Sequence, residues 1–127
     1  MRRAVFVLCL LVSACERDSA GALADAEAAF AARAPDAWDR FVAIDATSPE
    51  GRASRARLAR ADVRYRAGID ALALGDDETA NRALREAAAL APLDPDLYDD
   101  LARSCLAADR PDAAAGYYRK YLLARPN

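Results

Sequence analysis

The sequence contains no histidine, only three cysteines and few large aromatic side chains, with one tryptophan and three phenylalanines in 127 residues. It also lacks a glycine-rich phosphate loop and the pattern of a nucleophile elbow. Histidine is the usual general acid or base and a common metal ligand, so most acid–base, nucleophilic and metal mechanisms lack their side chains here. We therefore expect a protein that is not an enzyme and that binds no metal ion or cofactor.

The charge balance argues against nucleic acid as the main partner. The chain has 18 basic and 20 acidic residues and a formal net charge of -2. Proteins that bind nucleic acids gain most of their affinity by neutralising phosphates, which requires an excess of basic residues. We therefore expect a protein or peptide partner rather than a nucleic acid.

The first residues have the order of a bacterial secretion leader. A short positive segment, Met1 to Arg3, precedes an apolar run over residues 4–12 that is too short to cross a bilayer as a helix. The following Val12-Ser13-Ala14-Cys15 resembles the lipobox of bacterial lipoproteins. The resemblance implies a signal peptide over residues 1–14 and a covalent diacylglyceryl and acyl lipid on Cys15. The alternative is that Cys15 is a plain thiol behind an ordinary secretory leader.

The residues behind Cys15 predict where the mature protein is held. Residues 15–21 are mostly polar and predict a flexible tether between the lipid and a folded domain. Glu16 resembles the sorting signal that directs lipoproteins to the outer membrane, which implies a cell-envelope protein on the periplasmic face of that membrane; the inner membrane is the alternative. Cys9 leaves with the leader and the lipid occupies the Cys15 sulfur, so Cys105 has no partner for an internal disulfide.

Glycine and proline divide the remaining chain into segments with helical spacing of apolar residues and no strand-like alternation. This predicts an all-α domain over residues 22–127. Between Arg52 and Leu74 an apolar stripe recurs at steps of three and four and predicts the buried face of one helix. The stripe comprises Leu58, Ala61, Tyr65, Ile69 and Leu72.

A 34-residue period relates the last two segments. The related pairs are Ala80 and Ala114, Leu84 and Tyr118, Ala87 and Tyr121, and Pro92 and Pro126. The period and its small residues, with Gly68 and Ala102 at the expected helix crossings, resemble the tetratricopeptide family. The resemblance implies helix-turn-helix repeats stacked as a short α-solenoid, with a degenerate repeat at 22–50, repeat one at 61–94 and repeat two at 95–127.

The turns inside both repeats carry matching signals. Gly75 suits the left-handed conformation after a helix, and Asp76 suits the cap of the next helix. In the second repeat Asp109 takes the place of the glycine, and Pro111 suits a first helical turn. We therefore expect the same helix–turn–helix geometry twice.

The family register implies a concave groove that binds a partner peptide. The groove positions are Asp62, Tyr65, Ile69, Leu72, Asp96, Asp99, Arg103 and Leu106. Their mixture predicts an apolar groove with an acidic rim that prefers basic or apolar segments. The alternative is that the aspartates are only a solvated helix start.

Two further surfaces are candidates for contact with another protein copy, a partner or lipid headgroups. The chain stops at Asn127 without a capping helix, which predicts an exposed apolar edge at Tyr117, Tyr118, Tyr121 and Leu122 for homo-oligomer formation or docking. Six arginines of the segment from residue 52 to 66 flank the apolar stripe. They favour either a solvated helix surface or contact with anionic lipid headgroups.

These features together predict a non-enzymatic adaptor for protein–protein interaction in the cell envelope. Tetratricopeptide lipoproteins similar to this chain assist the assembly of pilus, secretion or outer-membrane complexes, and the sequence does not choose among these roles. The alternative is a self-associating structural lipoprotein without a dedicated client.

Overall fold

A computed structural model describes residues 18–126 of the chain, and the predicted leader, the lipobox and Cys15 lie outside this range. The described residues form helices joined by turns and contain no strand, which confirms the all-α prediction. A first helix covers residues 18–31. It is followed by α2 (Ala37–Ala43), α3 (Pro49–Ala73), α4 (Asp77–Leu90), α5 (Leu97–Ala107) and α6 (Pro111–Ala124).

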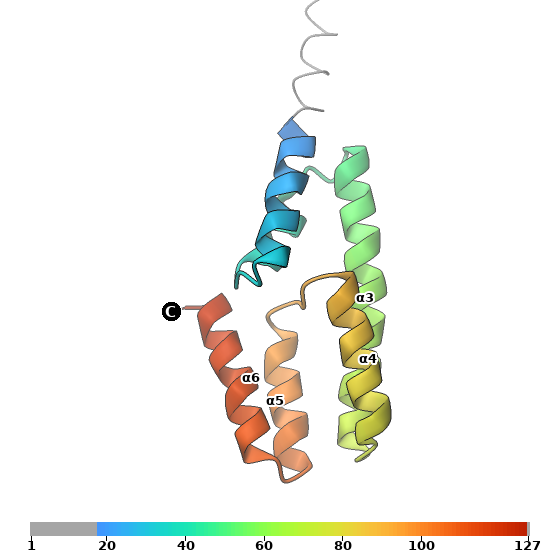
Figure 1. The fold of residues 1–127 in the computed structure, drawn as a ribbon, viewed down its shortest axis with the longest axis vertical. Coiled ribbons are helices and arrows are strands. Elements are labelled where there is room, and N and C mark those ends of the chain that lie inside the picture. Colours follow the sequence, from blue (N-terminus) through green and yellow to red (C-terminus); the bar gives the residue numbers. More distant parts are fainter. Residues whose placement is uncertain (1–17, 127) are drawn as a thin grey trace, which may run out of the picture.

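The helices are arranged mainly as antiparallel pairs (Figure 1). α3 pairs with α4, and α5 pairs with α6, while α3 also contacts α5 and α2. The first helix lies beside the N-terminal half of α3, and α6 runs back so that its end points toward the turn that precedes α2 (Figure 1). The 25-residue helix α3 is therefore the common support of all the pairs.

The 34-residue period recurs in the helix ends. α4 and α6 begin at residues 77 and 111 and end at residues 90 and 124, while α3 and α5 end at residues 73 and 107. Gly75 and Asp109 follow these ends with φ angles of 75° and 58°, so the left-handed turn is confirmed at both positions. Asp76 accepts a hydrogen bond from the Thr79 backbone N–H at 3.1 Å, and Pro111 opens α6, as predicted.

Small residues let the paired helices approach closely. Ala80, Ala102 and Ala114 are fully or almost fully buried. A Cβ atom on Gly68 would lie 2.7 Å from the Leu84 side chain, so any larger residue at this crossing of α3 and α4 would have to displace Leu84. The main core consists of alanine, leucine and a few larger side chains that pack between the helices.

The start of α3 is set by a tight junction with α2. Ser48 caps the helix by accepting a hydrogen bond from the Gly51 N–H at 2.9 Å, and Pro49 occupies the first turn. A Cβ on Gly51 would lie only 1.8 Å from the Asp45 carbonyl oxygen. The helix consequently begins three residues before the predicted start at Arg52.

One predicted boundary is wrong. Residues 18–21, assigned to the flexible tether over residues 15–21, are helical, and Ser19 is buried. The helical domain predicted to begin at residue 22 therefore includes these residues. Among the described residues, no helix is both long and apolar enough to span a membrane.

Candidate partner-binding groove

The predicted groove on helices α3 and α5 does not form as one surface. Tyr65 and Leu72 are only 6% and 5% exposed and belong to the main core. The Tyr65 hydroxyl donates a hydrogen bond to the Ala91 carbonyl at 3.1 Å, and burial raises the pKa of this phenol. The prediction from periodicity, that the stripe is buried, is confirmed for these residues, and Tyr65 also lines both cavities described below.

The other predicted groove residues are divided between ion pairs and scattered positions. Asp62 pairs with Arg66 at 2.8 Å, and Asp99 pairs with Arg103 within α5. Ile69 is half-buried against the core, whereas Asp96 and Leu106 are exposed. The acidic rim is therefore largely neutralised by neighbouring arginines on the same helices.

The predicted edge on α6 also needs correction. Tyr117 stacks on Tyr98 with ring centroids 6.4 Å apart, and both Tyr117 and Tyr118 pack against the main core. Tyr121 is half-buried. Of the predicted edge residues, Leu122 alone is exposed, with 56% of its surface accessible. Its neighbour Leu123 is 69% exposed. The exposed apolar surface of α6 is thus smaller than expected.

A cavity of about 810 Å³ lies instead between the N-terminal helices and the α5–α6 hairpin. We call it the central groove. The turn over residues 32–36 and the upper ends of α5 and α6, which contribute to its lining, face one another in Figure 1. Of the predicted groove residues it contains only Tyr65. The groove is lined by Glu27, Phe30, Ala31, Arg33, Ala34, Pro35, Ala37, Trp38, Tyr65, Ala88, Ala89, Pro92, Leu93, Tyr98, Lys120, Leu123 and Ala124.

The lining explains why the space is not filled. Many of its positions are alanine, and a methyl group cannot reach across the gap between α6 and helices α2 and α4, which do not pack against it. Larger apolar groups, Phe30, Trp38 and Tyr98, stand on different elements around it. Apolar walls with a few polar groups are typical of binding sites for ligands and peptides.

Two basic side chains border the central groove without a carboxylate partner. The structure gives neither Arg33 nor Lys120 an ion pair with any residue from 18 to 126. Lys120 Nζ lies 5.6 Å from the centroid of the Tyr117 ring. The third charged residue, Glu27, is paired with Arg57. The groove therefore carries a net positive charge, although the whole chain is slightly acidic.

A smaller cavity of about 260 Å³ adjoins the central groove and shares Trp38, Tyr65 and Pro92 with it. Asp62 and Asp94 line this second cavity. Burial raises the pKa of the Asp94 carboxyl, and the nearby negative charge of Asp96 acts in the same direction. Arg66, which pairs with Asp62, lines the same cavity, so Asp94 is its remaining acidic group.

Arg125 joins the two walls of the central groove. Its guanidinium donates to both carboxylate oxygens of Asp39, at 2.9 and 3.2 Å, and lies 5.9 Å from the Trp38 ring centroid. Asp96 is 3.9 Å away. Because the backbones of α2 and α6 do not pack against each other, this side-chain contact is their connection.

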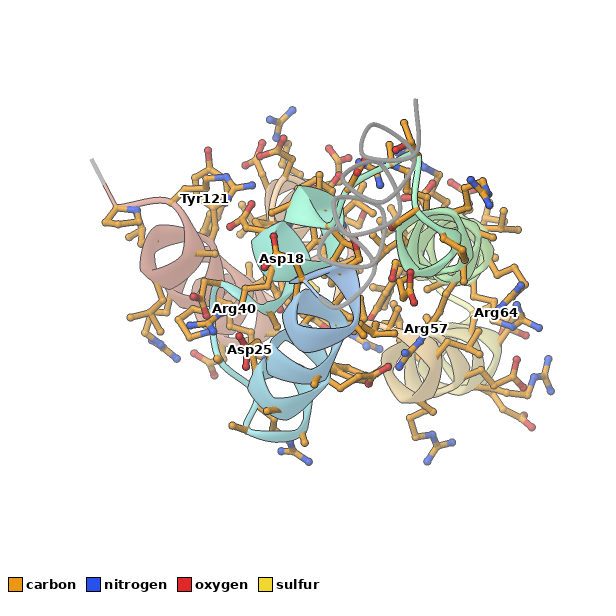
Figure 2. The ribbon with its side chains drawn as sticks, turned by 90° about the horizontal axis from the view of Figure 1, so that it is seen from above. Asp18, Asp25, Arg40, Arg57, Arg64 and Tyr121 are labelled. Carbon is orange, nitrogen blue, oxygen red and sulfur yellow. The ribbon has the colours of Figure 1, made fainter. Side chains whose placement is uncertain are left out.

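The arginines of α3 bind mainly to the protein itself. Arg57 lies over the rings of Phe30 and Phe41, pairs with Glu27 and donates to the Leu90 carbonyl. Figure 2 shows its side chain between the N-terminal helix and the α3–α4 hairpin, with Arg64 on the outer side. Further partners are the Thr47 carbonyl for Arg52, the Val42 and Ile44 carbonyls for Arg55, Glu86 for Arg64 and Asp62 for Arg66.

The acidic and cysteine side chains within residues 18–126 form no cluster that could hold a metal ion. Cys105 is buried and its thiol pKa is raised by that burial, which is typical of a structural cysteine rather than a nucleophile.

Comparison of the chain with protein-family models, with curated proteins and with solved structures gives no match. The tetratricopeptide and lipoprotein interpretations therefore depend on the residues and helix geometry described above.

Proposed function

We propose that the protein is a non-enzymatic adaptor, built from tetratricopeptide-like repeats, that binds a segment of a partner protein in the central groove. The observation that carries this proposal is the cavity of about 810 Å³ between α6 and helices α2 and α4, which do not pack against α6. Leaving apolar and aromatic surface open to water is unfavourable, and such surface commonly marks an interaction site.

The repeat geometry supports the same proposal. Two helix hairpins have ends 34 residues apart and a left-handed turn at the same repeat position. Stacked hairpins of this kind present extended surfaces to peptides and helices. The buried alanines at Ala80 and Ala114 agree with the close helix approach of the tetratricopeptide family.

We further propose that a lipid on Cys15 holds this module in the cell envelope, on the periplasmic face of the outer membrane. The support is the order of positive segment, short apolar run and lipobox in the sequence. Replacing Cys15 with serine should remove incorporated palmitate and move the protein from the membrane to the soluble fraction. Retention of the label in Cys15→Ser would disprove the lipid assignment.

The adaptor proposal can be tested by photocrosslinking in cells of the source organism. A photoreactive amino acid at Ala89 faces the central groove, and the same residue at Arg82 on the same helix serves as the matched control because Arg82 is exposed and does not line the groove. We expect a crosslinked partner from position 89 only. Equal crosslinking from both positions, or none from position 89, would contradict binding in the groove.

Self-association is a second candidate because Leu122 and Leu123 expose adjacent apolar side chains. In that case the replacements Leu122→Gln and Leu123→Gln should convert a dimer into a monomer in sedimentation experiments. A wild-type protein that stays monomeric at high concentration would exclude this alternative.

A further inference from the structure

We infer that the partner segment bound in the central groove is an acidic, apolar peptide. This inference depends on the proposed function of the groove and specifies the chemistry of its ligand. It is the opposite of the preference for basic segments that the sequence predicts from Asp62, Asp96 and Asp99.

Two positive charges remain at the central groove after the ion pairs among the described residues are counted. Asp62 and Asp99 are neutralised by Arg66 and Arg103, so the predicted acidic rim offers little attraction for a basic segment. Arg33 and Lys120 border the central groove, and neither is paired with a carboxylate of the described residues. The complementary ligand therefore carries negative charge.

The two positive charges lie on different elements of the fold. Arg33 belongs to the turn after the first helix, where it adopts a φ of 54°, and Lys120 belongs to α6. They therefore reach the groove from opposite walls. An ion pair formed beside an apolar wall is less screened by water than one on an open surface, so both positions can contribute to specificity.

Apolar side chains line the central groove between the two positive charges. Phe30, Trp38, Tyr98 and Leu123 surround the groove, and the alanines between them leave room for side chains of a ligand. A peptide with alternating apolar and acidic residues matches both features. A fatty acid matches the apolar surface but has only one carboxylate for two cations on opposite walls, and for this reason we favour a peptide.

The test measures binding of fluorescein-labelled peptides to the full-length chain by fluorescence anisotropy at low salt. The probes alternate leucine with glutamate, with glutamine or with lysine. We expect the glutamate probe to bind about tenfold more tightly than the lysine probe, with the glutamine probe between them, which is the effect of two modest charge–charge interactions. The preference should decrease at high salt.

Charge reversal assigns the effect to the groove. The double variant Arg33→Glu with Lys120→Glu should prefer the lysine probe. The matched control, Arg82→Glu with Arg119→Glu, changes the net charge equally at exposed residues that do not line the groove and should keep the original preference. If the reversed variant does not fold, the milder Arg33→Gln with Lys120→Gln should abolish the discrimination between probes.

The outcomes separate this inference from the proposed function. Binding of all three probes with equal affinity would overturn the acidic preference and leave the groove as a peptide site. No binding of any probe would count against both. Displacement of the glutamate probe by sodium oleate below its micelle concentration, or by a second copy of the protein at rising concentration, would overturn the peptide assignment in favour of those ligands.

Discussion

The two walls of the central groove are attached to the rest of the protein by arginines of different kinds. On the N-terminal wall, the Arg57 guanidinium lies over two aromatic rings, and its side chain is only 26% exposed. It also binds Glu27 and the Leu90 carbonyl. Arg125 holds the α6 wall through Asp39, in a pair whose side chains are 33% and 44% exposed. Both carboxylates are 44% exposed and both arginines lie over aromatic rings, but Arg57 is less exposed, lies over two rings and also binds a carbonyl of α4, so the N-terminal attachment makes more contacts. We therefore expect the groove to change its width on the α6 side.

The strongest way to disrupt the N-terminal wall is to change Gly51. In Gly51→Ala the new methyl group would collide with the Asp45 carbonyl, so the α2–α3 junction must shift. We expect a loss of about 3 kcal/mol in the free energy of unfolding, at the upper end of overpacking effects. Chemical denaturation measures it. Gly21→Ala is the control, because nothing lies within 4 Å of its added Cβ and alanine favours a helix; it should not destabilise the protein.

Removing the arginine of the N-terminal wall should have the next largest effect. Arg57→Ala leaves Glu27 and the Leu90 carbonyl without this donor and removes a cation from two aromatic rings. We expect a loss of about 2 kcal/mol in the free energy of unfolding. Arg60→Ala on the same helix is the comparison, since Arg60 is exposed, and its effect should be within about 0.5 kcal/mol. Equal effects of the two replacements would refute the special role of Arg57.

The contact between Arg125 and Asp39 should contribute less. A double-mutant cycle with Asp39→Asn and Arg125→Gln should give a coupling free energy of about 0.5 kcal/mol that decreases in 1 M salt, because water screens the half-exposed pair. The swapped variant Asp39→Arg with Arg125→Asp should recover part of it. A coupling that is independent of salt would mean that the α6 wall is held as firmly as the N-terminal wall.

The smallest effect is expected at Asp94, in the loop between α4 and α5. Burial raises the pKa of this carboxyl in the folded state, so ionisation costs more in the folded than in the unfolded chain. The contribution of Asp94 to the free energy of unfolding is therefore greatest below pH 3.8, the ordinary pKa of the group, and is lost as the pH rises through the folded-state pKa. Asp94→Asn should stabilise the protein by a few tenths of a kcal/mol at pH 7, on the order of single surface effects, and by nothing at pH 3. Thermal unfolding at both pH values distinguishes this from a pH-independent change.

The local features were predictable because their signals lie within a few residues of each other. The turn at Gly75, the cap at Asp76 and the left-handed Asp109 follow from the conformational preferences of those residues, and the structure confirms them. Ala80 and Ala114 were recognisable from their equal position in the repeat, and both are buried.

The central groove could not be predicted because it forms between residues far apart in the sequence. Its alanines have the same helical spacing whether they face a neighbouring helix or a cavity, so the periodicity does not separate the two cases. The hydrogen bond of the Tyr65 hydroxyl could not be predicted either, because nothing local indicates that the Ala91 carbonyl, 26 residues later, accepts it. Likewise, the arginines of α3 bind mostly backbone carbonyls, which any sequence could supply.

The position of Trp38 has a practical consequence. It is the only tryptophan of the chain, its ring lies beneath the Arg125 guanidinium, and it borders both cavities. Light at the red edge of protein absorbance therefore excites Trp38 alone, without any added label. This residue lies where the α6 wall meets the N-terminal helices. The wavelength and quenching of its emission provide an optical record of whether that wall is in place.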